Sequence, residues 1–335
     1  MNKNKEPLVS ICCITYNHEQ FIVEAIEGFL KQETDFSFEI IIQDDASTDR
    51  TADIIRKYEK KYPKIIKPIY NKENQYSKCP SSILLPPIKA SKGKYIALCE
   101  GDDYWTDPLK LQKQITEMKK HPECQLSFHP AIVKWEDGSN KDKILCQHSI
   151  KNKIFSIEEV ILGGGGFMPT ASVIINALVI PKIISFFEAA KEVPIGDYYV
   201  QILGSENGGA LYLSNVMSVY RKCSNSWSDK IENNSEHLNS VIISLIEIYN
   251  EIDAFTNHKY TELFANRKRH SISSIIISLK VDLKTRENIF NLYRNEVSIK
   301  DKILWSTIFK HQTIINILKP LKKLAIYIQH SVASI

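Results

Sequence analysis

The chain has 335 residues, which is enough for two domains or for one large domain with an appendage. Hydrophobic residues make up 43% of it and charged residues 24%, a balance that excludes a disordered or low-complexity protein. The net charge of +4 does not indicate a nucleic-acid-binding protein, and the seven scattered cysteines lack the spacing of a zinc site or a disulfide framework.

The expected location follows from the start of the chain and from the distribution of apolar residues. Residues 1–7 are polar and charged, without the apolar stretch of a signal peptide. No apolar run reaches the length needed to span a bilayer, and unpaired cysteines fit a reducing compartment. We therefore expect a cytoplasmic protein.

Predicted strands and helices alternate in the first part of the chain. Residues 8–14 form a near-continuous apolar run, typical of a strand that is buried on both faces of a parallel sheet. Further strands are predicted at 38–42, 65–70 and 95–99, with helices between them. This alternation predicts a doubly wound α/β sheet, whose ligand lies beyond the carboxyl ends of the strands.

Polar residues follow three of these predicted strands. They are Thr15, Tyr16 and Asn17 after the first strand, Asp44 and Asp45 after the second, and Glu100, Asp102 and Asp103 after the fourth. Because the ends of parallel strands meet at one edge of the sheet, these groups should share a crevice. The last group holds three acids within four residues, which repel one another and predict a divalent cation with oxygen ligands.

The middle of the chain is less regular. Pro108 suits the start of a helix that runs to about Lys120, residues 125–133 read as a strand, and residues 134–153 as a loop. Four glycines at 163–166 predict a flexible loop, because no strand precedes them and no Lys-Ser or Lys-Thr follows as in a P-loop. Asp197 begins a predicted helix, either as a simple N-cap or as a catalytic acid.

From about residue 232 the pattern becomes helical. Residues 236–295 carry recurrent Ile and Leu, and the last forty residues mix apolar side chains with lysines. Basic amphipathic helices of this kind can lie on an anionic membrane surface, pack on their own domain or pair with a second subunit. We expect peripheral contact with the inner face of the plasma membrane, or a homodimer, through residues 300–335.

The ordered motifs at the strand ends, together with Gly93-Lys94-Tyr95-Ile96, resemble the family 2 glycosyltransferases of the GT-A fold. Residues 167–172, Gly196-Asp197 and Tyr220-Arg221 look like the acceptor-side half of bacterial members that build surface polysaccharides. The resemblance implies a GT-A domain over residues 1–230, with a Rossmann-like, mostly parallel sheet flanked by helices. Its nucleotide-binding half would span about 7–133 and its acceptor half about 134–230, and residues 231–335 would form a helical extension.

The resemblance also implies an activity, namely metal-dependent transfer of a sugar, with inversion, from a nucleoside diphosphate sugar to a glycan or lipid-linked acceptor. The donor is expected to be a UDP-sugar. It implies that Asp102 contacts the ribose, that Asp103 with Glu100 binds Mn²⁺ or Mg²⁺, and that Asp197 is the general base. The residues implied to bind the nucleotide are Thr15, Tyr16, Asn17, Asp44 and Asp45.

One position departs from the family's pattern. Members often carry a His two residues after the Tyr-Arg pair, where it reaches the metal or the diphosphate, whereas this chain has Cys223. Either Arg221, Lys222 or His237 replaces that contact, or the activity is reduced. The alternative reading is therefore a non-catalytic subunit that binds a nucleotide-sugar or a glycan in a polysaccharide assembly complex. A nucleotidyltransferase is disfavoured, because no Gly-rich signature follows the first strand.

Overall fold

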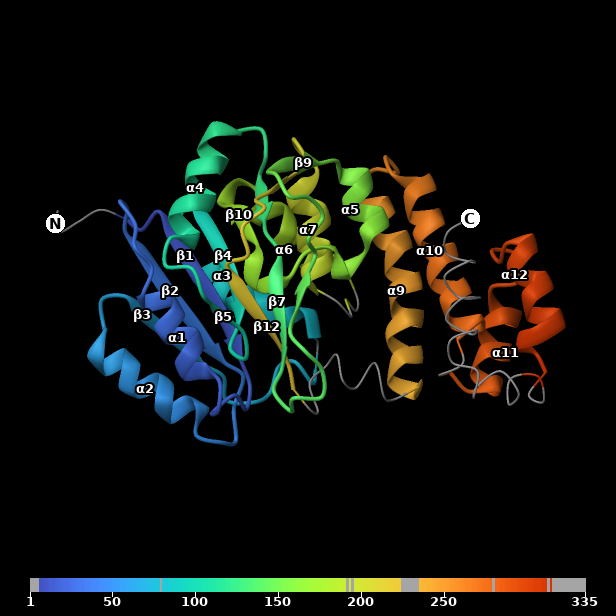
Figure 1. Cartoon of the computed structure of the whole chain (residues 1–335), viewed down its shortest axis with the longest axis horizontal. Coiled ribbons are helices and arrows are strands. Elements are labelled where there is room, and N and C mark those ends of the chain that lie inside the picture. The colour runs from blue at the N-terminus through green and yellow to red at the C-terminus, as the bar shows by residue number, and fades with distance from the viewer. Residues whose placement is uncertain are drawn as a thin grey trace. The chain divides into compact units, whose positions relative to one another are not determined.

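The computed structural model describes residues 6–78, 80–190, 193, 196–223, 235–278, 281–311 and 314. The chain divides into two compact units, residues 1–224 and residues 225–335 (Figure 1). The first unit holds every strand of the described chain, and the described part of the second is helical.

Four parallel strands form the N-terminal half of the main sheet, in the order β3-β2-β1-β4. They are β1 (Val9–Thr15), β2 (Phe38–Asp44), β3 (Ile66–Tyr70) and β4 (Tyr95–Glu100). The helices between them are α1 (Ile22–Leu30), α2 (Thr51–Lys61) and α3 (Leu85–Ala90). The predicted β-α alternation is therefore confirmed in this half of the unit.

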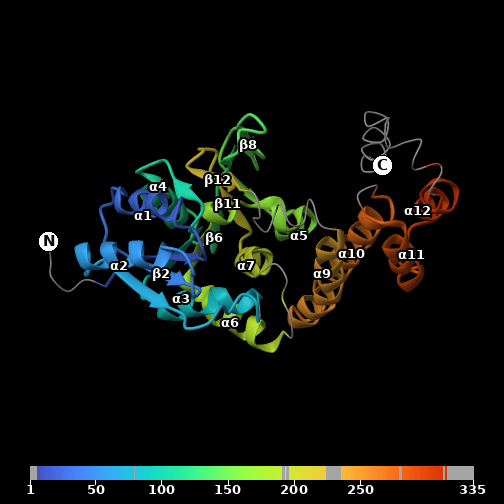
Figure 2. The same ribbon diagram turned by 90° about the horizontal axis from the view of Figure 1, so that it is seen from below.

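The strand β1 is buried on both of its faces, as its apolar run predicts. Val9, Ile11 and Cys13 on one face belong to a core that also contains side chains of α1 and of α4 (Lys110–Lys120). Cys12 points to the other face, where its thiol lies 3.2 Å from the hydroxyl of Ser91, just after α3. Figure 2 shows α1 and α4 on one side of the sheet and α3 on the other.

The main sheet continues beyond β4 with shorter strands, in the order β4-β10-β6-β11-β9. They are β10 (Ile174–Asn176), β6 (Leu126–Phe128), β11 (Ala210–Tyr212) and β9 (Lys153–Phe155). The strand β10 is antiparallel to both of its neighbours, and β11 runs parallel to β6. The eight strands form the large, helix-flanked sheet of the expected α/β class.

A second sheet has the order β5-β12-β7-β8. Its strands are β5 (Tyr104–Trp105), β12 (Ser218–Lys222), β7 (Ala131–Trp135) and β8 (Lys143–Leu145). The strand β12 pairs antiparallel with β5 and parallel with β7, beside which it is drawn in Figure 1. This sheet lies next to the acidic segment, because β5 directly follows Asp103.

Two predictions for the middle of the chain are wrong. Residues 125–133 are not one strand, because the segment breaks at His129–Pro130 into β6 and β7, which belong to different sheets. Proline has no N–H to donate to a ladder and so ends the pairing of β6. Residues 134–153 are not all loop either, since β8 lies within them and β9 begins at Lys153.

The α-helices between β9 and β11 are α5 (Ile157–Gly163), α6 (Ile180–Ala189) and α7 (Gly196–Ser205). A capping box formed by Ser156 and Glu159 starts α5. The four glycines are not all loop, because Gly163 ends α5 and residues 165–167 form a single 3₁₀ turn. The α7 amide of Gln201 donates to the carbonyl oxygen of Met168 and so holds this segment.

The second unit is built from helices α9 (Ser235–Phe255), α10 (Thr261–Ile276), α11 (Leu283–Leu292) and α12 (Ile299–Leu304), followed by a π-helical turn, Trp305–Phe309. It has its own apolar core, which includes Ile246, Ile272, Ile289 and Trp305. No helix of the described residues is both long enough and apolar enough to cross a membrane. Most of the predicted membrane or dimer segment, residues 300–335, lies outside the described residues.

Candidate active site

The carboxyl ends of β1, β2 and β4 meet at one edge of the sheet. Thr15 pairs with Asp44 in the β1–β2 register, and Ile14 pairs with Glu100 in the β1–β4 register. Backbone hydrogen bonds tie the exit segments to each other, from the Asp45 N–H to the Thr15 carbonyl (2.9 Å) and from the Gly101 N–H to the Ile14 carbonyl (2.8 Å). The three predicted groups of polar residues therefore lie side by side.

His18 links the first and last of these groups. Its Nδ1 lies 3.1 Å from Thr15 Oγ1, and its Nε2 lies 3.8 Å from a carboxylate oxygen of Asp102. Gly101 permits this contact, because a Cβ there would lie 2.5 Å from Thr15 Oγ1. Sequence reasoning missed His18, although it directly follows the Thr-Tyr-Asn motif, because its partner is eighty-four residues away.

Asn17 and Tyr16 have different surroundings. Asn17 has a φ of 54°, a left-handed conformation that Asn tolerates better than most residues. Its side-chain oxygen accepts from the Thr48 N–H at 2.8 Å, and its own N–H donates to the hydroxyl of Ser47 at 2.9 Å. Asn17 thus joins the β1 and β2 exit loops, whereas the Tyr16 ring is 41% exposed and available for stacking.

Asp45 is buried, and three hydrogen bonds from the loop after β3 reach its carboxylate. Oδ1 accepts from Asn71 Nδ2 (2.7 Å) and from the N–H of Gln75 (2.8 Å), and Oδ2 accepts from the N–H of Tyr76 (3.0 Å). A carboxylate has about four acceptor positions, so one is left on Asp45.

The neighbouring carboxylate of Asp44 has an unused oxygen. Its Oδ2 accepts from the Ser47 N–H at 3.2 Å, but its buried Oδ1 has no hydrogen-bond partner among the described residues. A buried polar atom without a partner costs about 1–3 kcal/mol, which a ligand with a suitable donor would relieve.

The acids after β4 are crowded. Asp103 is 1% exposed, and its Oδ1 accepts from the N–H of Arg221 at 2.9 Å. Burial, together with Asp102 and Glu100, raises the pKa of Asp103 well above its usual range. Burial, Asp102 and Asp197 raise the pKa of Glu100 to about 8. Like charges at this spacing favour binding of a cation.

The residues present fit a divalent cation that is shared with a ligand. Asp103 Oδ2 is buried and has no hydrogen-bond partner within the described parts of the chain. Among those same residues, no three His, Cys, Asp or Glu side chains lie close enough to hold a metal by themselves. Mg²⁺ and similar ions are often held by one or two carboxylates plus substrate phosphates and water, and Asp103 with Glu100 could supply the protein's share.

Asp197 lies in the first turn of α7, where it is partly buried. Its Oδ2 accepts from Thr170 Oγ1 (3.0 Å) and its Oδ1 from the N–H of Tyr198 (2.9 Å). Burial raises the pKa of Asp197. Because its charge contributes to the raised pKa of Glu100, the carboxylate lies within electrostatic range of the acids after β4. The fold therefore brings together acids that are about a hundred residues apart.

Arg221 supports the acid segment rather than facing a ligand. Its guanidinium pairs with Glu24 and with Glu136, where Nε lies 2.7 Å from Oε1. It also donates to the carbonyl oxygen of Asp102 at 2.7 Å and lies over the ring of Tyr104. The side chain is 1% exposed, so Arg221 does not replace the missing histidine as a diphosphate contact.

Cys223 is half-buried near the same acids. Burial, Asp102 and Glu136 raise the pKa of its thiol to about 11. Cysteine sulfur is a soft ligand that suits Mg²⁺ poorly, so Cys223 is a weaker ligand for such an ion than the histidine that family members often carry. The side chain of His237 lies outside the part of the structure that is described.

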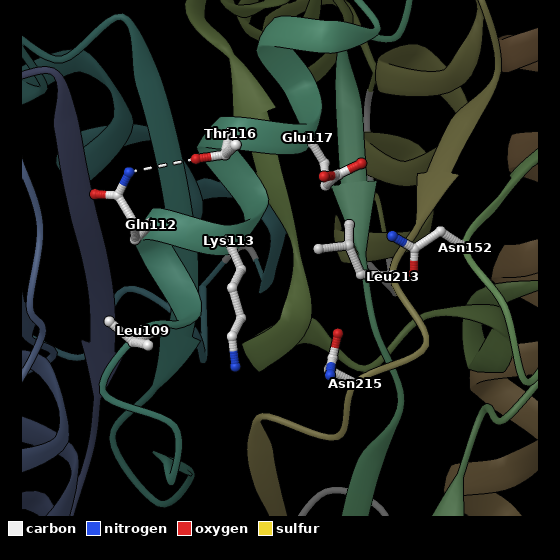
Figure 3. Close-up of a pocket in the computed structure, with 8 residues that line it drawn as sticks. All are labelled: Leu109, Gln112, Lys113, Thr116, Glu117, Asn152, Leu213 and Asn215. Carbon is white, nitrogen blue, oxygen red and sulfur yellow. Dashed lines mark hydrogen bonds between the residues drawn. The ribbon is translucent and has the colours of Figure 1, made fainter.

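A separate pocket of about 270 Å³ lies beside α4. Figure 3 shows Gln112, Lys113, Thr116 and Glu117 of α4 on one side of it. Its other lining residues are Leu109, Asn152, Leu213 and Asn215. None of these belongs to the strand-exit groups, so this pocket is distinct from the candidate active site.

A family model and several known proteins match this chain. A family model described as glycosyl transferase family 2 matches residues 10–168. An uncharacterized Mycobacterium tuberculosis protein is 38% identical over 214 residues, which cover 64% of this chain and 58% of that protein. The putative teichuronic acid biosynthesis glycosyltransferase TuaG of Bacillus subtilis is 33% identical over 142 residues, covering 42% and 54% respectively.

A third relative is the Escherichia coli UDP-Glc:alpha-D-GlcNAc-diphosphoundecaprenol beta-1,3-glucosyltransferase WfaP, which is 39% identical over 112 residues, or 33% of this chain and 41% of that protein. The chain thus spans 41% to 58% of the length of these three curated relatives.

Two solved structures share the fold at low identity. TarS of S. aureus in complex with UDP-GlcNAc has a TM-score of 0.54 at 16% identity, covering 86% of this chain and 87% of that chain. The mannosyltransferase PcManGT of Pyrobaculum calidifontis, in complex with GDP-Man and Mn²⁺, has a TM-score of 0.51 at 12% identity, covering 96% and 84%. These likenesses confirm the predicted fold class.

Proposed function

We propose that the chain, whose residues 10–168 match the model of glycosyl transferase family 2, is an inverting, metal-dependent glycosyltransferase of cell-surface polysaccharide synthesis. The observation that carries this proposal is that Asp103, whose buried Oδ2 has no partner in the described structure, lies with Glu100 at the exit of β4. Asp197 of α7 is within electrostatic range of Glu100. The substrates would be a nucleoside diphosphate sugar and a glycan or lipid-linked acceptor.

The donor proposed is a UDP-sugar. Tyr16 would stack on the base. Asp45, through its remaining acceptor position, and Asp44, through its free oxygen, would accept hydrogen bonds from the base or the ribose. Asp102 would contact the ribose. Thr15 supports this group through His18, and Asn17 shapes it by joining two loops. The naming of TarS and WfaP with UDP-linked sugars supports uracil over other bases.

The cation proposed is Mn²⁺ or Mg²⁺, held by Asp103 with Glu100. Bound there, it would neutralise the diphosphate and stabilise it as the leaving group. The Asp103 carboxylate is held in place for this role, because Arg221 fixes its other oxygen and is itself braced by Glu24 and Glu136. The solved complex of PcManGT with Mn²⁺ supports a divalent metal in a protein of this fold.

Asp197 is proposed as the general base. Its raised pKa makes the carboxylate a stronger proton acceptor, and the Thr170 hydroxyl and a backbone N–H hold it in one orientation. It would take the proton of the acceptor hydroxyl as that oxygen attacks the anomeric carbon, from the side opposite the leaving diphosphate. Attack in this direction inverts the anomeric centre.

The first prediction concerns Asp103. With Mn²⁺ and a panel of UDP-, GDP- and dTDP-sugars, the wild-type chain should release nucleoside diphosphate from one donor, and EDTA should stop the release. Asp103→Asn should lower this rate at least about a hundredfold, because it removes a metal ligand. Asp53→Asn is the matched control, since Asp53 is an exposed helix carboxylate paired with Arg56. Full activity of Asp103→Asn, or no metal-dependent binding of UDP, would contradict the proposal.

The second candidate function is a non-catalytic subunit that binds a nucleotide-sugar or a glycan. It is favoured by the neutral thiol of Cys223 at the position where related enzymes often carry a histidine. Tight, metal-dependent UDP binding without turnover of any donor would support this candidate. Appearance of turnover in Cys223→His would then identify the cysteine as the cause.

We also propose that the helical unit makes peripheral contact with the inner face of the membrane or with a second copy of the chain. The described end of this unit supports the proposal, because Ile299 and Ile303 are 78% and 56% exposed on α12, and Lys300 and Lys302 lie beside them. Apolar side chains flanked by lysines suit an anionic lipid surface.

A further inference from the structure

The loop after β3, residues 71–78, is organised around Asp45. Besides the three hydrogen bonds to the Asp45 carboxylate, Asn74 Nδ2 donates to the Asp45 carbonyl oxygen at 3.2 Å. The backbone N–H of Asn71 donates to the carbonyl oxygen of Asp44 at 2.9 Å. Five hydrogen bonds therefore connect this loop to two residues at the end of β2.

The loop also has hydrogen bonds of its own. Asn74 Oδ1 accepts from the N–H of Ser77 at 2.8 Å, and the Ser77 hydroxyl donates to the Asn74 carbonyl oxygen at 2.9 Å. The Tyr76 N–H donates to Asp45, and the residues on either side of Tyr76 are held by the bonds between Asn74 and Ser77. Together these bonds fix the backbone conformation at Tyr76. A side chain held in this way is pre-organised for contact with a ligand.

The Tyr76 side chain is placed among the acids of the candidate site. The phenol interacts electrostatically with Glu100 and Asp197, and burial with those two charges raises the pKa of Tyr76 to about 12. The phenol therefore stays protonated and is a hydrogen-bond donor at neutral pH. The side chain is 41% exposed, and its hydroxyl makes no hydrogen bond with any residue of the described structure.

We propose that Tyr76 is a specificity-determining residue that contacts the transferred sugar, and that Asp45 is the residue that positions it. This inference rests on the proposed function. In an inverting transfer the anomeric carbon lies between the diphosphate, at the metal acids, and the general base. A side chain within electrostatic range of both Glu100 and Asp197 can therefore reach the sugar, and its hydroxyl can donate to a sugar oxygen.

The same arrangement connects the two ends of the donor. Asp45 has one acceptor position left for the base, and its other three hold the loop that carries Tyr76. Asp45 would thus hold the nucleoside and, at the same time, the loop whose Tyr76 reaches the sugar. Tyr76 should affect affinity for the sugar nucleotide but not for the nucleoside diphosphate alone.

The test compares two ligands on the full chain by isothermal titration in Mn²⁺. They are the sugar nucleotide from the UDP, GDP and dTDP panel that binds the wild type best, and its nucleoside diphosphate. Tyr76→Phe keeps the ring and should weaken the sugar nucleotide about fivefold, as for loss of one hydrogen bond, and leave the diphosphate within about twofold. Tyr58→Phe is the matched control, because its hydroxyl donates to Glu27 instead and neither affinity should change.

A second variant tests the positioning role. Asn71→Ala removes one of the bonds to Asp45 without altering Tyr76, and should also weaken the sugar nucleotide more than the diphosphate. In the double variant Asn71→Ala/Tyr76→Phe, the losses of affinity for the sugar nucleotide should be less than additive, because both changes act through the contact of Tyr76 with the sugar.

Two results would overturn the inference. One is wild-type affinity of Tyr76→Phe for the sugar nucleotide, and the other is equal weakening of both ligands. If the unmodified chain binds no nucleoside diphosphate or sugar nucleotide, the proposed function itself fails, and the inference falls with it. That outcome is recognised without any variant.

Discussion

At the scale of single residues, the positions that sequence reasoning found are those next to strand ends. Thr15, Asp44 and Glu100 can be assigned to one crevice because parallel strands align their carboxyl ends, and the register places them there. The sequence does not predict where the side chains of His18, Tyr76 and Arg221 lie, because each contacts a partner far along the chain. Arg221 reaches Asp103 across 118 residues, which no local pattern encodes.

Lys110, the first residue of α4, is a fully buried lysine. Its Nζ has no hydrogen-bond partner within the described residues, and it lies 4.0 Å from the centre of the Trp105 ring. Burial lowers the pKa of Lys110 to about 7. The lysine of an unfolded chain titrates near 10.4, so between pH 7 and about 10 the unfolded state holds one more proton than the folded state. Lys110 therefore makes the protein more stable as the pH rises through this window.

The variant Lys110→Met should remove this dependence. From pH 7.5 to 9.5, the free energy of unfolding should rise less steeply in the variant than in the wild type, by about 1.4 kcal/mol per pH unit. Urea unfolding followed by circular dichroism at three pH values measures both slopes. The contributions of the other titrating groups cancel when the two slopes are compared. Lys113→Met is the control on the same helix, because Lys113 is partly exposed and pairs with Asp107. Parallel slopes for wild type and Lys110→Met would show that Lys110 is charged in the folded protein.

At the scale of elements, the sequence predicts the long buried strands well and the short ones poorly. The apolar run of β1 identifies it, because a strand covered on both faces needs apolar residues throughout. The strands β8 and β9 each have three residues, and most of these are exposed, so they carry no such signal. They are strands because β8 pairs with β7 and β9 pairs with β11 through backbone hydrogen bonds.

Gly28 sets the distance between α1 and β5. A Cβ at Gly28 would lie 2.9 Å from the backbone oxygen of Trp105, which cannot move without shifting the segment that follows Asp103. Gly28→Ala should therefore destabilise the protein by about 1–3 kcal/mol, although alanine is the better helix former. Thermal unfolding measures the change. Gly166→Ala is the matched control, because no atom lies within 4 Å of its added Cβ, and it should be close to neutral. Equal melting temperatures for both variants would mean that α1 and β5 can separate at little cost.

At the scale of the whole molecule, the two units have separate apolar cores, and the family match lies entirely in the first. The change from alternating strands and helices to helices alone predicts this division, because each pattern requires a different kind of packing. What the helical unit binds could not be predicted. Its apolar residues serve equally for an internal core, a membrane surface or a partner, and only the exposure of each side chain separates the first use from the others.

Exposed apolar residues on α12 provide the test of the proposed membrane or dimer contact. Ile299→Ser/Ile303→Ser should lower the affinity for anionic phosphatidylserine vesicles, measured by co-sedimentation, by at least about a hundredfold if α12 lies on lipid, since each buried isoleucine contributes about 1.5–3 kcal/mol. High salt should weaken the same binding, because the lysines beside them contribute by charge. If the contact is instead a homodimer, the variant should lower the mass measured by light scattering and leave vesicle binding unchanged. Leu178→Ser, which alters a 73% exposed side chain in the first unit, should change neither quantity. An unchanged mass together with unchanged vesicle binding in the α12 variant would exclude this face of the helical unit from both contacts.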